Sequence, residues 1–164
     1  MAKAQIFSVD VILASAILIT ILISVFFYWN YSQRKLSHQE DQSYLLSSAE
    51  QAAAQLLLTS GGNWSASNSS AISSLGLAHQ PWILSPSKIA NFSLLPYNTS
   101  KELLGMKGQE FFMQVRQWNG TAYYTINEIG PEMNQAPEIL KVTRLALLNN
   151  QWAVLELFIW VPHE

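Results

Sequence analysis

The feature that most constrains this chain is a continuous apolar run near its N-terminus. From Val11 to Trp29 the sequence contains no charged residue, no Gly and no Pro, and it ends in the aromatic cluster Phe26–Trp29. At a rise of about 1.5 Å per residue, the run nearly crosses a hydrocarbon core of about 30 Å. Aromatic side chains gather where transmembrane helices meet the membrane interface. The run therefore predicts a membrane-spanning helix.

A soluble core helix and a signal peptide both fit this run less well. A buried helix of a soluble protein would need more partner surface than a chain of 164 residues offers. A secretory signal peptide has a shorter apolar region and a cleavage pattern of small residues after it, whereas Asn30–Lys35 lacks that pattern. The helix is therefore expected to stay on the mature protein.

The helix is expected to continue beyond the membrane, because no Gly or Pro occurs before Gly61. Its second part is amphipathic, with apolar residues at helical spacing at Leu45, Ala49, Ala52 and Leu56. Thr59–Gly62 supplies a stop signal. The predicted helix runs from about Ile6 to Leu58, on the order of 80 Å at helical rise.

The C-terminal part of the sequence predicts two β-hairpins. Asn119-Gly120 separates the alternating run around Phe111–Arg116 from a second β-prone run, Tyr123–Ile126, and Asn-Gly is a strong hairpin signal. Asn149-Asn150 is a plausible tight turn between two longer runs, Ile139–Leu148 and Trp152–Val161. We therefore expect a four-stranded antiparallel sheet wrapped against the second part of the long helix, which is an α+β fold.

The last strand and two short helices complete this prediction. Trp152–Val161 is apolar on both faces except at Glu156, as expected of a central strand covered by the long helix, with its other face meeting more chain or a neighbouring subunit. Ser85-Pro86 predicts a helix start before Lys88–Phe92. The capping-box spacing of Thr99 and Glu102 predicts a second start, with an end at Gly105.

The first residues resemble a known processing signal. Lys3, Ala4 and Gln5 lead directly into the apolar run, and this arrangement resembles the class III signal of archaeal type IV pilins. The resemblance implies cleavage between Ala4 and Gln5 by a membrane peptidase on the cytoplasmic side. Together with the predicted architecture, it implies four regions: a leader at 1–4, a membrane and filament-core helix at 5–30, its amphipathic continuation at 31–60 and an extracellular head domain at 61–164.

Further segments of the head are similar to archaeal pilin-like surface proteins. They are Gly62–Ser65, Gly76–Ala78, Leu84–Lys88, Tyr97–Gly105 and the closing Leu147–Trp160. The resemblance implies a structural subunit of a type IV pilus-like surface filament, a helical homopolymer used in adhesion. Its expected partners are copies of itself, the membrane before assembly, the prepilin peptidase and the assembly machinery. The alternative is a monomeric surface glycoprotein or adhesin that keeps the same helix as an anchor.

Asp10 is the only charged residue at the membrane edge of the apolar run. In pilins, an acidic residue near the mature N-terminus is thought to neutralise a neighbour's amino group. Counted from Gln5, however, Asp10 is the sixth residue and not the fifth, so a simple interfacial carboxylate is an equal alternative. Ala14 and Ala16 are expected to be assembly positions, because helices approach closely at small residues.

Glycosylation triplets of the form Asn-x-Ser/Thr are unusually dense. Six of ten asparagines begin one, against about one or two expected by chance. Asn30 lies too close to the predicted membrane to be used. N-linked glycans are expected at the other five, which are predicted in loops or turns: Asn63, Asn68, Asn91, Asn98 and Asn119. The alternative is that Asn and Ser simply favour turns.

Charge and chemistry restrict the remaining functions. Arg34 and Lys35 follow the apolar run while Lys3 precedes it, which does not favour an external C-terminal domain, yet the triplets and the leader point outward. A net charge of −2 gives no basic surface for nucleic acid. The chain has no Cys, its three His are scattered, and no catalytic, cofactor or metal motif occurs. Sugar stacking by Trp64, Trp82 or Trp118 competes with a role in the core.

Overall fold

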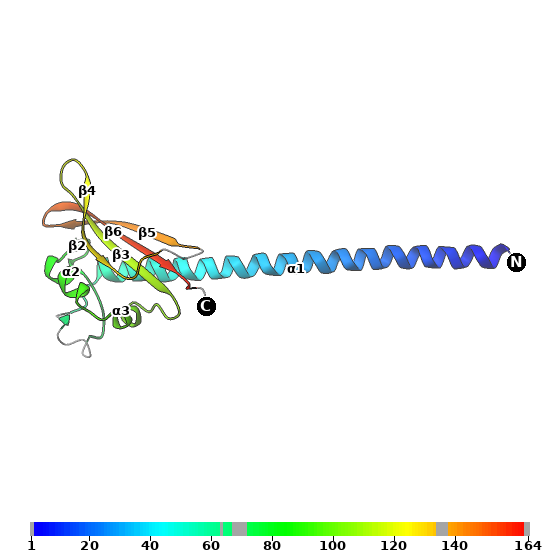
Figure 1. The fold of residues 1–164 in the computed structure, drawn as a ribbon, viewed down its shortest axis with the longest axis horizontal. Coiled ribbons are helices and arrows are strands. Elements are labelled where there is room, and N and C mark those ends of the chain that lie inside the picture. The colour runs from blue at the N-terminus through cyan, green and yellow to red at the C-terminus, as the bar shows by residue number, and fades with distance from the viewer. Residues whose placement is uncertain (1, 63, 67–71, 134–137, 163–164) are drawn as a thin grey trace. The chain divides into compact units, whose positions relative to one another are not determined.

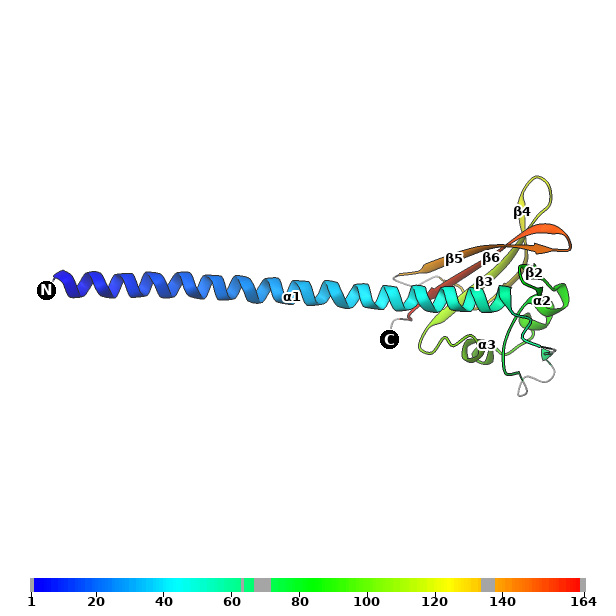
Figure 2. The same cartoon turned by 180° about the vertical axis from the view of Figure 1, so that it is seen from behind.

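The computed structural model describes the backbone of residues 2–62, 64–66, 72–133 and 138–162, and the side chains of these ranges apart from residues 2–8 and 37–41. The chain forms two compact units, Met1–Ser43 and Tyr44–Glu164. The elements, shown in Figures 1 and 2, are α1 (Ala2–Leu58), β1 (Ala78–Gln80), β2 (Ile83–Leu84), α2 (Pro86–Ser93), α3 (Tyr97–Leu103), β3 (Glu110–Trp118), β4 (Tyr123–Ile129), β5 (Leu140–Leu148) and β6 (Gln151–Trp160).

The unit Met1–Ser43 consists of the first part of α1. Its polar side chains bond to the helix itself: the hydroxyls of Ser15, Thr20 and Ser24 donate to carbonyls four residues earlier at 2.7–2.8 Å. Such bonds remove the cost of leaving a hydroxyl unpaired in an apolar environment. The expected helix is confirmed, and it begins earlier than predicted, at Ala2.

The unit Tyr44–Glu164 is built on one sheet with the strand order β1-β2-β5-β6-β3-β4. The four long strands pair antiparallel, with Val115 of β3 opposite Leu155 and Thr143 of β5 opposite Glu156. β6 is therefore a central strand, as its doubly apolar sequence predicted. The two short strands were not predicted; β2 pairs parallel to β5, with Ile83 opposite Leu147. The fold is α+β, with six strands in place of the expected four.

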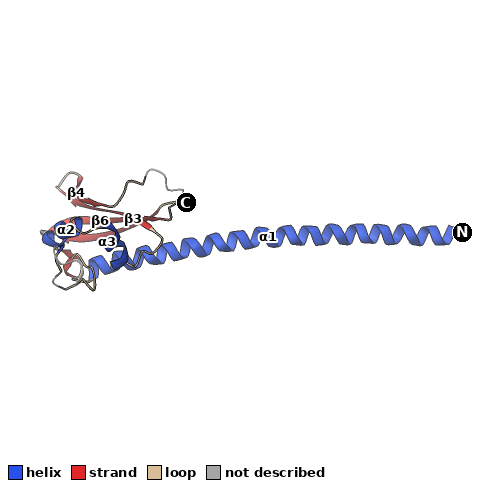
Figure 3. Ribbon diagram, turned by 60° about the horizontal axis from the view of Figure 1, so that its bottom comes forward, coloured by secondary structure: helices blue, strands red, loops and turns tan. Residues whose placement is uncertain are grey.

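All three helices contribute to a single core on one face of the sheet. The buried stripe of α1 (Leu45, Ala49, Ala52, Ala53, Leu56 and Leu57) meets the alternate residues of β6 (Ala153, Leu155, Leu157 and Ile159) in one cluster. Ile89 and Phe92 of α2 join the same cluster. Figure 3 shows the strands together with the last turns of α1. The amphipathic pattern after Ser43 thus covers a sheet, as predicted.

Both predicted hairpins are present. Asn149 and Asn150 adopt left-handed φ values of 52° and 63°, which Asn tolerates better than most residues and which a two-residue turn of this kind requires. The first hairpin has a longer turn, Asn119–Ala122, in which the Asn119 side-chain oxygen accepts bonds from the backbone N–H groups of Thr121 and Ala122, both at 2.9 Å.

The C-terminal end of α1 is completed by residues that come later in the chain. The backbone N–H groups of Leu77 and Trp82 donate to the carbonyls of Leu56 and Leu57 at 2.9 and 3.0 Å. The Lys88 ammonium donates to the carbonyl of Ser60, just past the helix. These groups satisfy carbonyls that a helix end leaves without an intrahelical partner. At Gly61, an added Cβ would lie 2.6 Å from the Gly76 nitrogen, so only Gly fits there.

The short helices confirm one predicted start and correct the other. Ser85 precedes α2 with Pro86 in its first turn, as predicted, although the Ser85 side chain makes no capping bond. The predicted capping box at Thr99 is wrong, because α3 begins at Tyr97 after Pro96. The Ser100 N–H donates to the Pro96 carbonyl at 3.1 Å. The backbone of Pro96 thus starts the helix before Thr99 can cap it.

Candidate functional site

The first candidate site is the apolar surface of α1. Val9–Leu36, 28 residues, is long and apolar enough to cross a membrane, judged by length and composition. At about 1.5 Å per residue it extends about 42 Å. None of its apolar window is buried inside the described structure, and its large side chains are about half to three-quarters exposed. Water is a poor solvent for such a surface. The segment therefore needs an apolar surrounding, which lipid or other helices can provide.

The predicted processing and assembly residues lie on this helix. The backbone of Lys3, Ala4 and Gln5 is helical, and their side chains lie outside the described residues. Asp10 is exposed, with no ion pair or hydrogen bond to the described part of the chain. Ala14 and Ala16 are also exposed. Both alanines are thus accessible to a neighbouring helix.

The predicted glycosylation sites fall in different settings. Asn63 and Asn68 lie outside the described residues. Asn119 is exposed in the β3–β4 turn, as predicted. Asn91 and Asn98 lie in the short helices α2 and α3, so their prediction as loop or turn residues is wrong. Asn98 is exposed and Asn91 half-buried. In both helices the asparagine side chain still reaches the surface.

The face of the sheet opposite the core carries a carboxylate that its neighbours bury. Glu156 of β6 is about 5% exposed and pairs with Lys141 at 2.5 Å and with Arg116 at 3.5 Å. Gln114 also donates to it, at 2.5 Å. Burial by itself would raise the pKa of Glu156. The hydrogen bond and charge of Lys141, the charge of Arg116 and the hydrogen bond from Gln114 together hold the pKa below its ordinary value. Glu156 is therefore ionised at neutral pH.

A second carboxylate joins α3 to β3. Glu110 accepts a bond from the Tyr97 hydroxyl and pairs with Lys101, both at 2.6 Å. Burial opposes ionisation of Glu110, yet the hydrogen bonds and the Lys101 charge hold its pKa below the ordinary value. Burial and the bond to Glu110 raise the pKa of Tyr97, so its hydroxyl remains protonated. This cluster fastens α3 to the sheet and leaves no free nucleophile.

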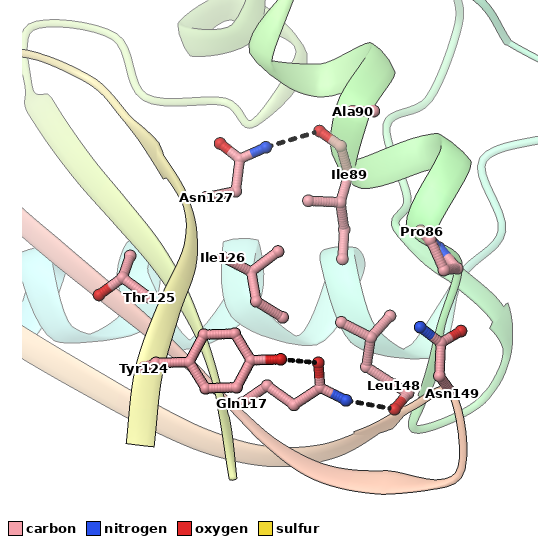
Figure 4. A pocket seen from close by; sticks show the side chains of 10 residues that line it. All are labelled: Pro86, Ile89, Ala90, Gln117, Tyr124, Thr125, Ile126, Asn127, Leu148 and Asn149. Carbon is pink, nitrogen blue, oxygen red and sulfur yellow. Dashed lines mark hydrogen bonds between the residues drawn. The ribbon is translucent and has the colours of Figure 1, made fainter. Parts of the chain in front are cut away.

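A cavity of about 480 Å³ lies between α2 and the strands (Figure 4). α2 forms one wall with Pro86, Ile89 and Ala90. β4 forms the opposite wall, and Gln117, Leu148 and Asn149 close the base. Not one of its ten lining residues is charged. Its size lies within the range of small-molecule sites.

The polar side chains of this cavity are held in place by hydrogen bonds. Gln117 is about 5% exposed; its Nε2 donates to the Leu148 carbonyl and to Gln151, both at 2.9 Å, and its Oε1 accepts from the Tyr124 hydroxyl at 3.0 Å. Asn127 reaches across from β4 and donates to the Ile89 carbonyl at 3.2 Å. Thr125 points away from the cavity (Figure 4).

The sequence does not predict this cavity. Its walls come from four elements between Pro86 and Asn149, so no local pattern marks it. The only local signal was a polar residue, Gln117, at a position where the alternation of β3 places a buried side chain. Of the three tryptophans considered for sugar stacking, Trp64 is buried and bonds to the Gly76 carbonyl. None of the three lines the cavity.

Two further indications of function would be a metal site and a match to a known protein. Within the described residues, no group of three or more His, Asp or Glu side chains could hold a metal ion. No protein-family model matches the chain, and neither a curated protein nor a solved structure does. Three features of the molecule therefore bear on function: the apolar helix, the head domain and the cavity.

Proposed function

We propose that this chain is a structural subunit of an archaeal type IV pilus-like surface filament and not an enzyme. The observation that carries the proposal is the exposed apolar surface of Val9–Leu36, no part of whose apolar window is buried, attached in sequence to a unit with its own core. In the membrane, lipid would cover that surface. In a filament, copies of the same helix would cover it by packing together.

The polar groups of the helix support this two-environment role. Ser15, Thr20 and Ser24 bond to their own helix, so each tolerates lipid and helix packing equally well. Ala14 and Ala16 are small and exposed, which allows close approach of a second helix. The head, with N-linked glycans at some of its triplets, would face outward, and cleavage after Ala4 would precede assembly.

The second candidate is a monomeric anchored glycoprotein, which would use the same helix without packing it. Ala14→Leu and Ala16→Leu distinguish the two, because both keep the segment apolar while adding bulk where helices would touch. Ile21→Leu is the matched control, since it preserves side-chain volume. Electron microscopy of surface material should show short or absent filaments for the alanine variants and normal filaments for the control.

Wild-type protein recovered only as a detergent-soluble monomer would reject the filament and favour the anchored glycoprotein. N-terminal sequencing tests the maturation step separately: Gln5 is the expected first residue, and Met1 or Ala2 on surface protein would exclude pilin-type processing. Peptide mass spectrometry tests the topology. Asn63, Asn68, Asn91, Asn98 and Asn119 all bare in native material would remove the support for an external head.

A further inference from the structure

We infer that the cavity between α2 and β4 binds a neutral saccharide. The cavity belongs wholly to the unit Tyr44–Glu164, so this inference does not depend on the proposed filament. Its volume of about 480 Å³ is sufficient for a small ligand. No part of the proposed assembly uses it.

The lining excludes charged ligands as preferred occupants. All ten lining residues are neutral, so the cavity offers no counter-charge for a phosphate, a carboxylate or an amine. It presents amide and hydroxyl groups beside the apolar side chains of Ile89, Ile126 and Leu148. Amide side chains carry both donors and acceptors, and a hydroxyl is also both. A ligand rich in hydroxyl groups and without charge matches this set.

The amides are fixed before any ligand arrives. The Nε2 of Gln117 donates to the Leu148 carbonyl and to the Gln151 side chain. These two hydrogen bonds fix the orientation of the Gln117 amide at the base of the cavity. Asn127 uses Nδ2 on Ile89, so its Oδ1 is the group that can accept from a ligand. Ordered side chains lose little conformational entropy when a ligand binds.

Tyr124 and Asn149 supply the remaining contacts. The Tyr124 ring extends into the cavity and is about 47% exposed, and its hydroxyl is anchored on Gln117 (Figure 4). An exposed aromatic ring with a fixed hydroxyl offers an apolar body and a polar tip in one side chain. Asn149 is exposed at the opposite side, in the tight turn, and no hydrogen bond to the described residues occupies its amide.

Two sources could supply the sugar. The Asn91 triplet begins next to Ala90, which lines the cavity, so a glycan on Asn91 is one source. The other is a polysaccharide outside the protein, bound during adhesion. Both present the same hydroxyl chemistry, and the Asn91→Gln variant separates them.

The test uses the full chain in lipid nanodiscs and saturation-transfer NMR, with empty nanodiscs as background. The probes are the methyl glycosides of glucose, galactose, mannose and N-acetylglucosamine, and N-acetylalanine methylamide serves as a neutral probe of similar size without a sugar ring. We expect transfer to at least one glycoside. Asn149→Gly suits the left-handed turn and removes only the amide, and Tyr124→Phe removes only the hydroxyl. Each should raise the Kd about 2–10-fold.

Thr143→Val is the matched control, because Thr143 is exposed on β5 and does not line the cavity, and its Kd should equal that of the wild type. If free glycosides bind only to Asn91→Gln, the chain's own glycan is the occupant; if they bind equally to both, the source is external. The inference is overturned if no glycoside binds to either chain, if Thr143→Val weakens binding as much as Asn149→Gly, or if N-acetylalanine methylamide binds as well as the sugars.

Discussion

The helix α1 contains two stretches that differ in how apolar side chains are distributed around the helix axis. In Val9–Leu36 apolar residues cover every side, and the large ones are exposed. In Tyr44–Leu58 most apolar residues form one buried stripe, whereas Leu46, Leu58 and the polar Glu50 and Gln51 stay exposed. Strong helix formers dominate only the second stretch, because the first is rich in Ile, Val and aromatic residues, yet both stretches are helical. The distribution of apolar side chains around the axis indicates the surroundings of each stretch: apolar on all sides for the first, and apolar on one side for the second.

The largest expected effect comes from one substitution made in both stretches. Leu56→Ala should lower the free energy of unfolding of the unit Tyr44–Glu164 by about 2–5 kcal/mol, because Leu56 is fully buried and its loss leaves a cavity. Leu18→Ala should leave that free energy unchanged. Urea unfolding of the full chain in detergent, followed by Trp fluorescence in a Trp29→Phe background, measures both. Equal effects of the two variants would show that the stretches are not energetically distinct.

A charge in each stretch should give the next largest effect. Ile19→Lys should raise the free energy of membrane insertion by about 2.5–3.5 kcal/mol, since the lysine would sit near the centre of the apolar segment. Gln51→Lys, on the exposed side of the second stretch, should leave insertion unchanged. A microsomal insertion assay reports both. Normal insertion of Ile19→Lys would argue that Val9–Leu36 does not span the membrane.

The head tolerates a buried charge because the charge is paired, and Glu156→Gln tests this. We expect a loss of about 1–3 kcal/mol in unfolding free energy at pH 7, because charge-assisted bonds to Lys141 and Gln114 are weakened. The folded-state pKa of Glu156 is lowered, so its contribution is fully present above the unfolded-state pKa and is lost as the pH falls through the folded-state pKa. The variant should therefore lose less stability than the wild type in acid. Parallel acid unfolding curves would contradict this.

The smallest effect is expected for Ser24→Ala. The Ser24 hydroxyl already donates to the Thr20 carbonyl at 2.8 Å, so its removal should change the free energy of insertion by less than about 0.5 kcal/mol. The same insertion assay measures it. A larger gain on removing the hydroxyl would mean that the intrahelical bond does not shield this group from lipid.

The structural features that the sequence predicted are those that a short run of neighbouring residues determines. Asn119-Gly120 and Asn149-Asn150 marked both hairpins, and the doubly apolar run to Val161 marked the central strand. β1 and β2 have three and two residues, too few to show a period, and β2 is a strand because it pairs with β1 and β5. The cavity was not predictable for the same reason. Its amides are polar residues of ordinary strands and turns until the fold brings them together.

The way α1 ends has a consequence for how the protein is made. The carbonyls of Leu56 and Leu57 accept hydrogen bonds from Leu77 and Trp82, which are synthesised later. The carbonyl of Ser60 accepts from Lys88, which is thirty residues after Leu58. At about 5–20 residues per second, the ribosome needs about 1.5–6 s to supply that lysine. If the apolar stretch spans a membrane as proposed, it would have this interval to form its own hydrogen bonds and insert. The end of the helix gains these hydrogen-bond partners only when the head folds, so in the proposed membrane route translation would separate insertion from folding.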